Sequence, residues 1–311
     1  MKTVFMGTPE GAAYLLGELA ASGHEICSAV TRPDKPKGRG LKVQISPVAK
    51  RSEELDIPVL KPADVSDPAF LDEIRRLVPD VVIIAAFGRI LPKALLDIPK
   101  HGCINVHLSL LPKYRGASPV QAALMSGDED TGITIMRINE RLDEGDILAQ
   151  EKVKISVNEN AGELTERLFV LGGKLLLSTL PAIGSGEIAS VKQDGSKATF
   201  CKPIKRSDGL ISISDKSRNM INKIRAFTPR PGAYLECKGK KLKITSAEVY
   251  TEECSKMPPG TAVKLIKGRG LVVAAGDGCV LIKEVQPENS KIMSAEGFVN
   301  GYRIAIGEKI F

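Results

Sequence analysis

Residues 80–87 (Asp-Val-Val-Ile-Ile-Ala-Ala-Phe) form a continuous apolar run, and this run decides the fold class. A strand without alternating polar positions is typical of a parallel sheet that is covered on both faces. Helix-starting pairs, Thr8-Pro9, Ser46-Pro47 and Asp67-Pro68, lie between this run and similar segments. The other expected strands span residues 2–6, 25–31, 102–107, 131–138 and 147–155. Strands that alternate with helices predict an α/β fold with a doubly wound, mostly parallel, Rossmann-like sheet.

The sequence changes character after about Ser207. Short strand-like pieces recur there between Gly, Pro and Lys residues, and one helix is expected at residues 216–225. Such spacing is typical of a small all-β barrel or sandwich. We therefore predict a first domain at 1–193, a polar linker at 194–207 and a second domain at 208–311.

Composition limits the possible functions. The chain has 311 residues and a net charge of +7, and all of this excess lies after Asp208, where 17 basic residues face 10 acidic ones. A positive surface on the second domain is expected to favour a polyanion. The six cysteines form no C-x-x-C pair, which argues against structural zinc or a disulfide framework and favours the cytoplasm. No apolar run of membrane-spanning length is evident, so no membrane association is expected.

The first turn after a strand, Met6-Gly7-Thr8-Pro9-Glu10-Gly11, departs from G-x-G-x-x-G. Pro9 also removes a backbone amide that would bind a pyrophosphate. A nicotinamide dinucleotide site is therefore disfavoured.

A polar pair ends the strand at 102–107. Asn105 and His107 are two residues apart, so both side chains point to the same side of the sheet, at the strand end where ligands bind in such folds. The acidic turn at 142–146 supplies Asp143, which can orient the imidazole and raise its pKa. Taken separately, the histidine could be structural and the acidic turn a solvated loop.

Together these segments resemble the 10-formyltetrahydrofolate-dependent formyltransferases. The resemblance covers roughly the first two hundred residues and rests on residues 105–116, Pro119, 131–134 and 142–146. It implies that Asn105, His107 and Asp143 are catalytic. It also implies a folate site formed by the turn Ser109, Leu110, Leu111 and Pro112 and by the segment that contains Phe87, Gly88 and Ile90.

The reaction implied by this resemblance is the attack of an amine on a formyl carbon, which places negative charge on the formyl oxygen. The amide of Asn105 and a protonated His107 are the expected donors to that oxygen, with Asp143 holding the ring. The co-substrate would be 10-formyltetrahydrofolate. We expect no metal, because the transfer requires neither a metal ion nor a covalent enzyme intermediate.

The basic segment at 31–42 resembles the inserted loop of those family members that act on methionyl-tRNA. The resemblance therefore implies initiator Met-tRNA as the partner and an OB-like second domain that binds tRNA. Candidate phosphate contacts are Arg39, Lys37, Lys42, Arg225, Arg230, Lys240 and Lys241. A small amine substrate, such as glycinamide ribonucleotide or an amino-sugar nucleotide, and a catalytically inactive tRNA-binding protein are the alternatives. Nothing in the sequence requires more than a monomer.

Overall fold

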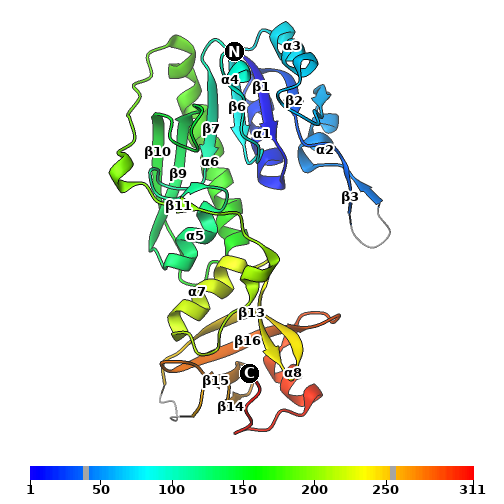
Figure 1. The fold of residues 1–311 in the computed structure, drawn as a ribbon, viewed down its shortest axis with the longest axis vertical. Helices are drawn as coiled ribbons and strands as arrows, with labels where there is room; N and C mark the ends of the chain where they lie inside the picture. Colours follow the sequence, from blue (N-terminus) through cyan, green and yellow to red (C-terminus); the bar gives the residue numbers. More distant parts are fainter. Residues whose placement is uncertain (38–41, 253–256) are drawn as a thin grey trace. The chain divides into compact units, whose positions relative to one another are not determined.

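The computed structural model describes residues 1–37, 42–252 and 257–311. They form two compact units (Figure 1). Unit 1 contains Met1–Pro119, Asp130–Lys154 and Thr165–Cys201, and unit 2 contains Val120–Glu129, Ile155–Leu164 and Lys202–Phe311. The second unit therefore includes two short segments from the first half of the chain as well as the C-terminal third.

Unit 1 is built on a seven-stranded sheet with the order β10-β9-β7-β6-β1-β2-β5. The neighbours from β7 to β5 are all parallel, and β9 runs antiparallel to both β7 and β10. This arrangement confirms the predicted mostly parallel sheet. The strands are β1 (Lys2–Gly7), β2 (Glu25–Val30), β5 (Val59–Leu60), β6 (Val81–Ala85), β7 (Cys103–His107), β9 (Asp130–Arg137) and β10 (Ile147–Lys154).

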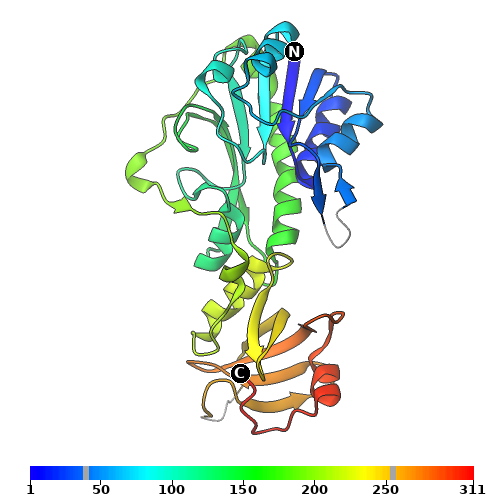
Figure 2. The ribbon, with the colours of Figure 1, turned by 45° about the vertical axis from the view of Figure 1, so that its right-hand side comes forward.

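Helices cover both faces of this sheet (Figure 2). They are α1 (Glu10–Ala21), α2 (Pro47–Glu54), α3 (Pro68–Leu77), α4 (Lys93–Leu96) and α6 (Ala161–Ser185). Helix α5 (Pro119–Ser126) belongs to unit 2 from Val120 onward. The N-terminus of α2 is capped by Ser46, which accepts a hydrogen bond from the amide of Ala49. Asp67 caps α3 in the same way, through the amide of Ala69. Both helices begin with proline, as their sequences predict.

The two faces of β7 have different neighbours. Cys103 packs with α3 and α4 in a core that includes Phe70, Ile74 and Leu95. Val106 faces the other way, against Gly172 of α6, where an added Cβ would lie 3.0 Å from the valine. Because side chains alternate along a strand, Asn105 and His107 lie on the same face as Cys103.

Helix α6 is long and apolar enough to cross a membrane by length and composition, the only such helix in the described part of the chain. No apolar run of this length is expected from the sequence alone. Leu168, Leu176, Leu180 and Ile183 of this helix are nevertheless buried in the protein. Packing against the sheet explains its apolar composition.

Two pairs of short strands lie outside the main sheet of unit 1. In and after the basic segment at 31–42, β3 (Lys35–Lys37) pairs antiparallel with β4 (Lys42–Gln44). The segment at 194–207 includes the 3-10 helix η1 (Gly195–Lys197) and the strand β11 (Phe200–Cys201), which pairs with β8 (Arg115–Gly116) in unit 1. The 3-10 helix η2 (Arg206–Gly209) follows in unit 2.

Unit 2 contains an antiparallel sheet with the path β12-β13-β16-β15-β14, which confirms the predicted all-β character. Helix α7 (Ser217–Phe227) packs on β13, and α8 (Ala295–Tyr302) packs on β15 and β16. The strands are β12 (Ala233–Cys237), β13 (Lys240–Tyr250), β14 (Ala262–Ile266), β15 (Gly270–Ala274), β16 (Cys279–Pro287) and β17 (Met293–Ser294), which pairs with β16.

One cysteine in this unit departs from expectation. Cys279 forms a disulfide, whereas the other described cysteines, Cys27, Cys103, Cys201 and Cys237, are free. Wide spacing along the chain did not predict this bond.

Candidate functional site

The site is centred on the end of β7. Asn105 is paired in register with Ile84 of β6 and Met136 of β9, so its backbone is fixed inside the sheet. No residue in the described ranges hydrogen-bonds its side-chain amide, which is partly exposed. This amide is therefore available to a ligand.

His107 lies two residues further along and is only 5% exposed. Its Nε2 is 3.0 Å from the carbonyl oxygen of Tyr114. A carbonyl oxygen only accepts hydrogen bonds, so Nε2 carries a hydrogen, and Nδ1 is the nitrogen that gains or loses a proton. Nδ1 lies 3.8 Å from Oδ2 of Asp143. The sheet thus brings Asn105 and His107 together, and the acidic turn adds Asp143, as predicted.

The protonation state of His107 corrects one expectation. Burial lowers the pKa of the imidazole, and the opposing influences of the Asp143 carboxylate and the Tyr114 carbonyl do not reverse this. Desolvation disfavours the charged ring. A lowered pKa favours the neutral imidazole, in which Nδ1 accepts a proton, over the cationic donor that the sequence suggested.

The Asp143 turn is tightly constrained. Asp143 has a φ of +48°, in the left-handed region that non-glycine residues rarely adopt. Its Oδ2 accepts a hydrogen bond of 2.8 Å from the amide of Gly116. Gly145 leaves no room for a side chain, because a Cβ there would lie 1.8 Å from the carbonyl oxygen of Arg137. The carboxylate is therefore fixed by both the turn and β8.

Two polar side chains that the sequence did not single out hold this turn. Gln193 donates from Nε2 to the carbonyls of Asp143 and Gly145, each at 2.8 Å. Its Oε1 accepts from Nε of Arg115 at 3.0 Å, and Arg115 also pairs with Glu144 at 3.2 Å. Arg115 is 3% exposed although it carries a charge. Its place directly before Gly116 was visible in the sequence, but the distant Gln193 gave no signal.

The predicted folate turn lies between β7 and β8. Ser109 is fully buried, and its hydroxyl donates to the carbonyl of Lys113 at 2.6 Å. Thr134 of β9 donates to the Ser109 carbonyl at 2.6 Å and accepts from the amide of Leu111 at 3.2 Å. Gln150 donates to the Leu111 carbonyl at 2.8 Å. Leu111 is buried, whereas Leu110 and Pro112 are partly exposed, so these two present the accessible surface of the turn.

The second predicted folate segment follows β6. Phe87 is buried in the core, Gly88 is exposed with a φ of +72°, and Ile90 is 80% exposed. Arg32 donates to the carbonyls of Phe87 and Gly88 at 3.2 and 2.7 Å. This arginine, which sequence reasoning missed as a partner, sets the backbone of the segment.

The predicted tRNA contacts differ in how much of each side chain is available. Arg225 is half-buried and donates to the carbonyl of Val157 and to Oδ1 of Asn222, so it has a structural role. Arg230 is exposed. Lys240 and Lys241 lie exposed on β13, and Nζ of Lys241 is 4.8 Å from the ring centre of Tyr234. Lys37 and Lys42 are paired in the hairpin, and Arg39 lies outside the described residues.

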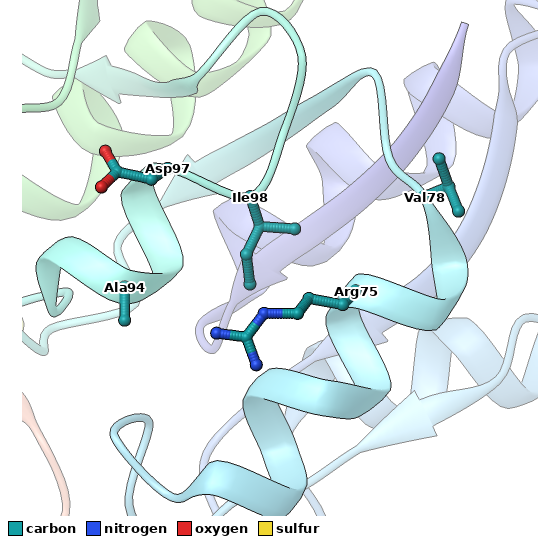
Figure 3. Close-up of a pocket in the computed structure, with 5 residues that line it drawn as sticks. All are labelled: Arg75, Val78, Ala94, Asp97 and Ile98. Atoms are coloured by element: carbon teal, nitrogen blue, oxygen red, sulfur yellow. The ribbon is translucent and has the colours of Figure 1, made fainter.

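A cavity of about 460 Å³ is lined by residues of the segments that precede β6 and β7 (Figure 3). It is lined by Arg75, Val78, Ala94, Asp97 and Ile98. None of the predicted site residues belongs to it. Arg75 and Asp97 also pair with neighbours on their own helices, Asp72 and Lys93.

Comparison with known proteins covers the whole chain. A model of the formyl transferase family matches residues 1–180, and a model of the formyl transferase C-terminal domain matches residues 203–303. The methionyl-tRNA formyltransferase of Geobacter sulfurreducens is 42% identical over 311 residues, covering 100% of this chain and 96% of that protein. The methionyl-tRNA formyltransferase of Syntrophus aciditrophicus is 43% identical over 304 residues, with 98% and 97% covered.

Solved structures share the fold at low identity. HypX from Aquifex aeolicus in complex with tetrahydrofolic acid gives a TM-score of 0.68 at 16% identity and covers 98% of this chain and 48% of that one. An N-formyltransferase from Helicobacter canadensis, in complex with folinic acid and dTDP-3-aminofucose, gives 0.67 at 18% identity and covers 92% and 99%. From its sequence matches over both domains, this chain belongs to the formyl transferase family.

Proposed function

We propose that this protein transfers the formyl group of 10-formyltetrahydrofolate to the α-amino group of methionine on initiator tRNA. The observation that carries the proposal is 42% identity to a methionyl-tRNA formyltransferase over the full chain, second domain included. Relatives of that name match the C-terminal third as well as the catalytic unit.

The residues at the end of β7 fit a formyl donor. The folate supplies an activated formyl carbon bonded to nitrogen. Asn105 presents an unpaired amide, which can donate to the developing oxyanion, beside the buried imidazole of His107. The accessible surfaces of Leu110, Pro112 and Ile90 provide apolar contacts for a flat heterocycle. Ser109, Leu111, Phe87 and Gly88 shape the backbone of this site.

His107 moves the proton in this mechanism. The attacking amine forms a bond to the formyl carbon and loses one proton, while the folate nitrogen leaves that carbon and gains one. A neutral Nδ1 can take the proton from the amine and then give it to the leaving nitrogen, so the ring returns to its initial state. The Asp143 carboxylate, 3.8 Å away, stabilises the imidazolium between the two transfers.

For tRNA binding we assign the exposed cations Arg230, Lys240 and Lys241, with Lys37, Arg39 and Lys42 of the basic segment at 31–42 contacting the acceptor end. Basic side chains along one strand favour contacts to phosphates over contacts to bases. Arg225 would support α7 rather than touch the nucleic acid. We place the enzyme in the cytoplasm as a monomer that requires no metal.

The test is a formyl-transfer assay with purified protein, 10-formyltetrahydrofolate and methionine-charged initiator tRNA. Uncharged tRNA, glycinamide ribonucleotide and an amino-sugar nucleotide are run in parallel. We expect transfer to the charged tRNA alone, and a loss of roughly 10²-fold or more in His107→Ala. Transfer to a small amine, or tRNA binding without transfer, would refute the proposal.

A further inference from the structure

Gln193 has its polar groups committed to protein contacts. Both hydrogens of its amide go to carbonyl oxygens on either side of Glu144, and its oxygen accepts from Arg115. The side chain lies beyond the last strand of the sheet, two residues after Val191, whose backbone pairs with Ile147 of β10. Gln193 is therefore anchored to the sheet and bonded to the acidic turn.

The turn needs such support because its backbone is strained. A non-glycine residue with positive φ costs roughly 1 kcal/mol or more and persists where surrounding contacts determine it. Asp143 has this conformation, and its carboxylate is one carbon away from the backbone. A shift of the Asp143 carbonyl would therefore move Oδ2 relative to His107.

Arg115 links this support to the other side of the site. Its guanidinium donates hydrogen bonds to Gln193 and Glu144. Its neighbours in the chain, Tyr114 and Gly116, contact the His107–Asp143 pair directly. The Tyr114 carbonyl meets Nε2 of His107, and the Gly116 amide meets Oδ2 of Asp143. One buried arginine and one amide thus connect both halves of the His107–Asp143 pair.

We infer that Gln193 is a positioning residue for formyl transfer, whose amide holds the Asp143 carboxylate against His107. This inference rests on the proposed function. The three bonds of its amide tie it to the turn and to Arg115, so it acts through Asp143 and not on the substrate. Without the amide, the turn relaxes, the carboxylate moves away from Nδ1, and the imidazolium formed during transfer loses its counter-charge.

The first test compares Gln193→Met, which keeps the length of the side chain and removes its polar atoms, with the wild type. We expect kcat to fall roughly 10-fold or more while KM for both substrates stays within about threefold, because binding contacts are unchanged. Ser190→Ala is the matched control, since Ser190 contacts Asp146 at the end of the same turn from an exposed position. It should keep its kcat.

A second test combines Gln193→Met with Asp143→Asn. If Gln193 acts through the carboxylate, the double variant is no slower than Asp143→Asn alone. Losses that multiply would overturn the inference. An inactive wild type, by contrast, would refute the proposed function and not this assignment, which then rests on the next measurement.

That measurement needs no substrate. The chain has only three histidines, so the His107 ring can be followed by NMR during a pH titration. Because the Asp143 charge raises the pKa of His107, its displacement in Gln193→Met should lower that pKa, and Asp143→Asn should do the same. An unchanged His107 titration in a folded Gln193→Met protein overturns the inference, and unfolding of the variant is checked by its circular dichroism.

Discussion

Replacing Asp143 with Asn tests how much the carboxylate contributes to the reaction. The amide keeps the size of the side chain and retains an oxygen for the Gly116 amide, which bonds Oδ2 at 2.8 Å, so the turn should be preserved. Only the charge is lost. Two unit charges 3.8 Å apart attract by about 4 kcal/mol at an effective dielectric constant of about 20. This is an upper value, because the Asp143 side chain is 17% exposed and partly screened.

If the imidazolium forms in the transition state, losing about 4 kcal/mol slows transfer by up to roughly 10³-fold. Partial screening brings the expected decrease in kcat to between about 10² and 10³. Single-turnover transfer of a labelled formyl group to Met-tRNA measures this step directly.

The pH profile gives an independent check on the same variant. Under the proposed mechanism His107 acts as a base, so the rate should rise with pH through its pKa. Loss of the carboxylate lowers that pKa further, and the acid limb of the profile moves to lower pH. A kcat within about threefold of the wild type, or an acid limb displaced to higher pH, would refute the role given to Asp143.

Three further results are expected. Burial lowers the pKa of His107 from its ordinary 6.5, so the folded protein should lose stability as pH falls below about 6.5. Urea unfolding at about pH 7.5 and 5.5 should show a smaller loss of stability in His107→Gln than in the wild type. An equal loss in the two proteins would contradict the burial argument. Gly116→Ala places a Cβ 2.1 Å from the Cys201 carbonyl oxygen at a φ of +122°, so it should lower the free energy of unfolding in urea by about 1–3 kcal/mol or more. The control Gly301→Ala lies in open space on α8 and should raise that free energy by up to about 1 kcal/mol. The double variant Lys240→Gln and Lys241→Gln should reduce the slope of log Kd for tRNA against log salt by about 2, and an unchanged slope would remove both residues from the interface.

The catalytic unit was predictable because its signals are local. Apolar runs such as residues 80–87 indicate buried parallel strands, and Ser46-Pro47 and Asp67-Pro68 mark helix starts through capping bonds that the structure contains. The pairing of Asn105 with His107 follows from the alternation of side chains along a strand. These features depend on residues within a few positions of one another.

What could not be predicted depends on contacts that are distant in the sequence. Gln193 lies 50 residues from Asp143, and no local pattern reports their hydrogen bond. The residues from 194 onward are polar and were expected to form a linker, yet β11 pairs with β8 and its Cys201 carbonyl restricts Gly116. Polar composition indicates solvent exposure. It does not reveal that the two residues of β11 pair with β8 and so hold this segment beside the site.

The lowered pKa of His107 has the same origin and changes the chemistry. From the sequence, an acidic neighbour suggested a charged imidazole, because the attraction between a carboxylate and an imidazolium can be anticipated from residue types. Burial cannot be anticipated in this way, and at a ring that is only 5% exposed it outweighs the carboxylate. A ring with a lowered pKa holds a proton weakly. In the proposed mechanism it takes one from the attacking amine and releases it readily to the leaving folate nitrogen. We therefore expect His107 to carry a proton between two nitrogens, with Asp143 stabilising the charge during the interval in which it exists.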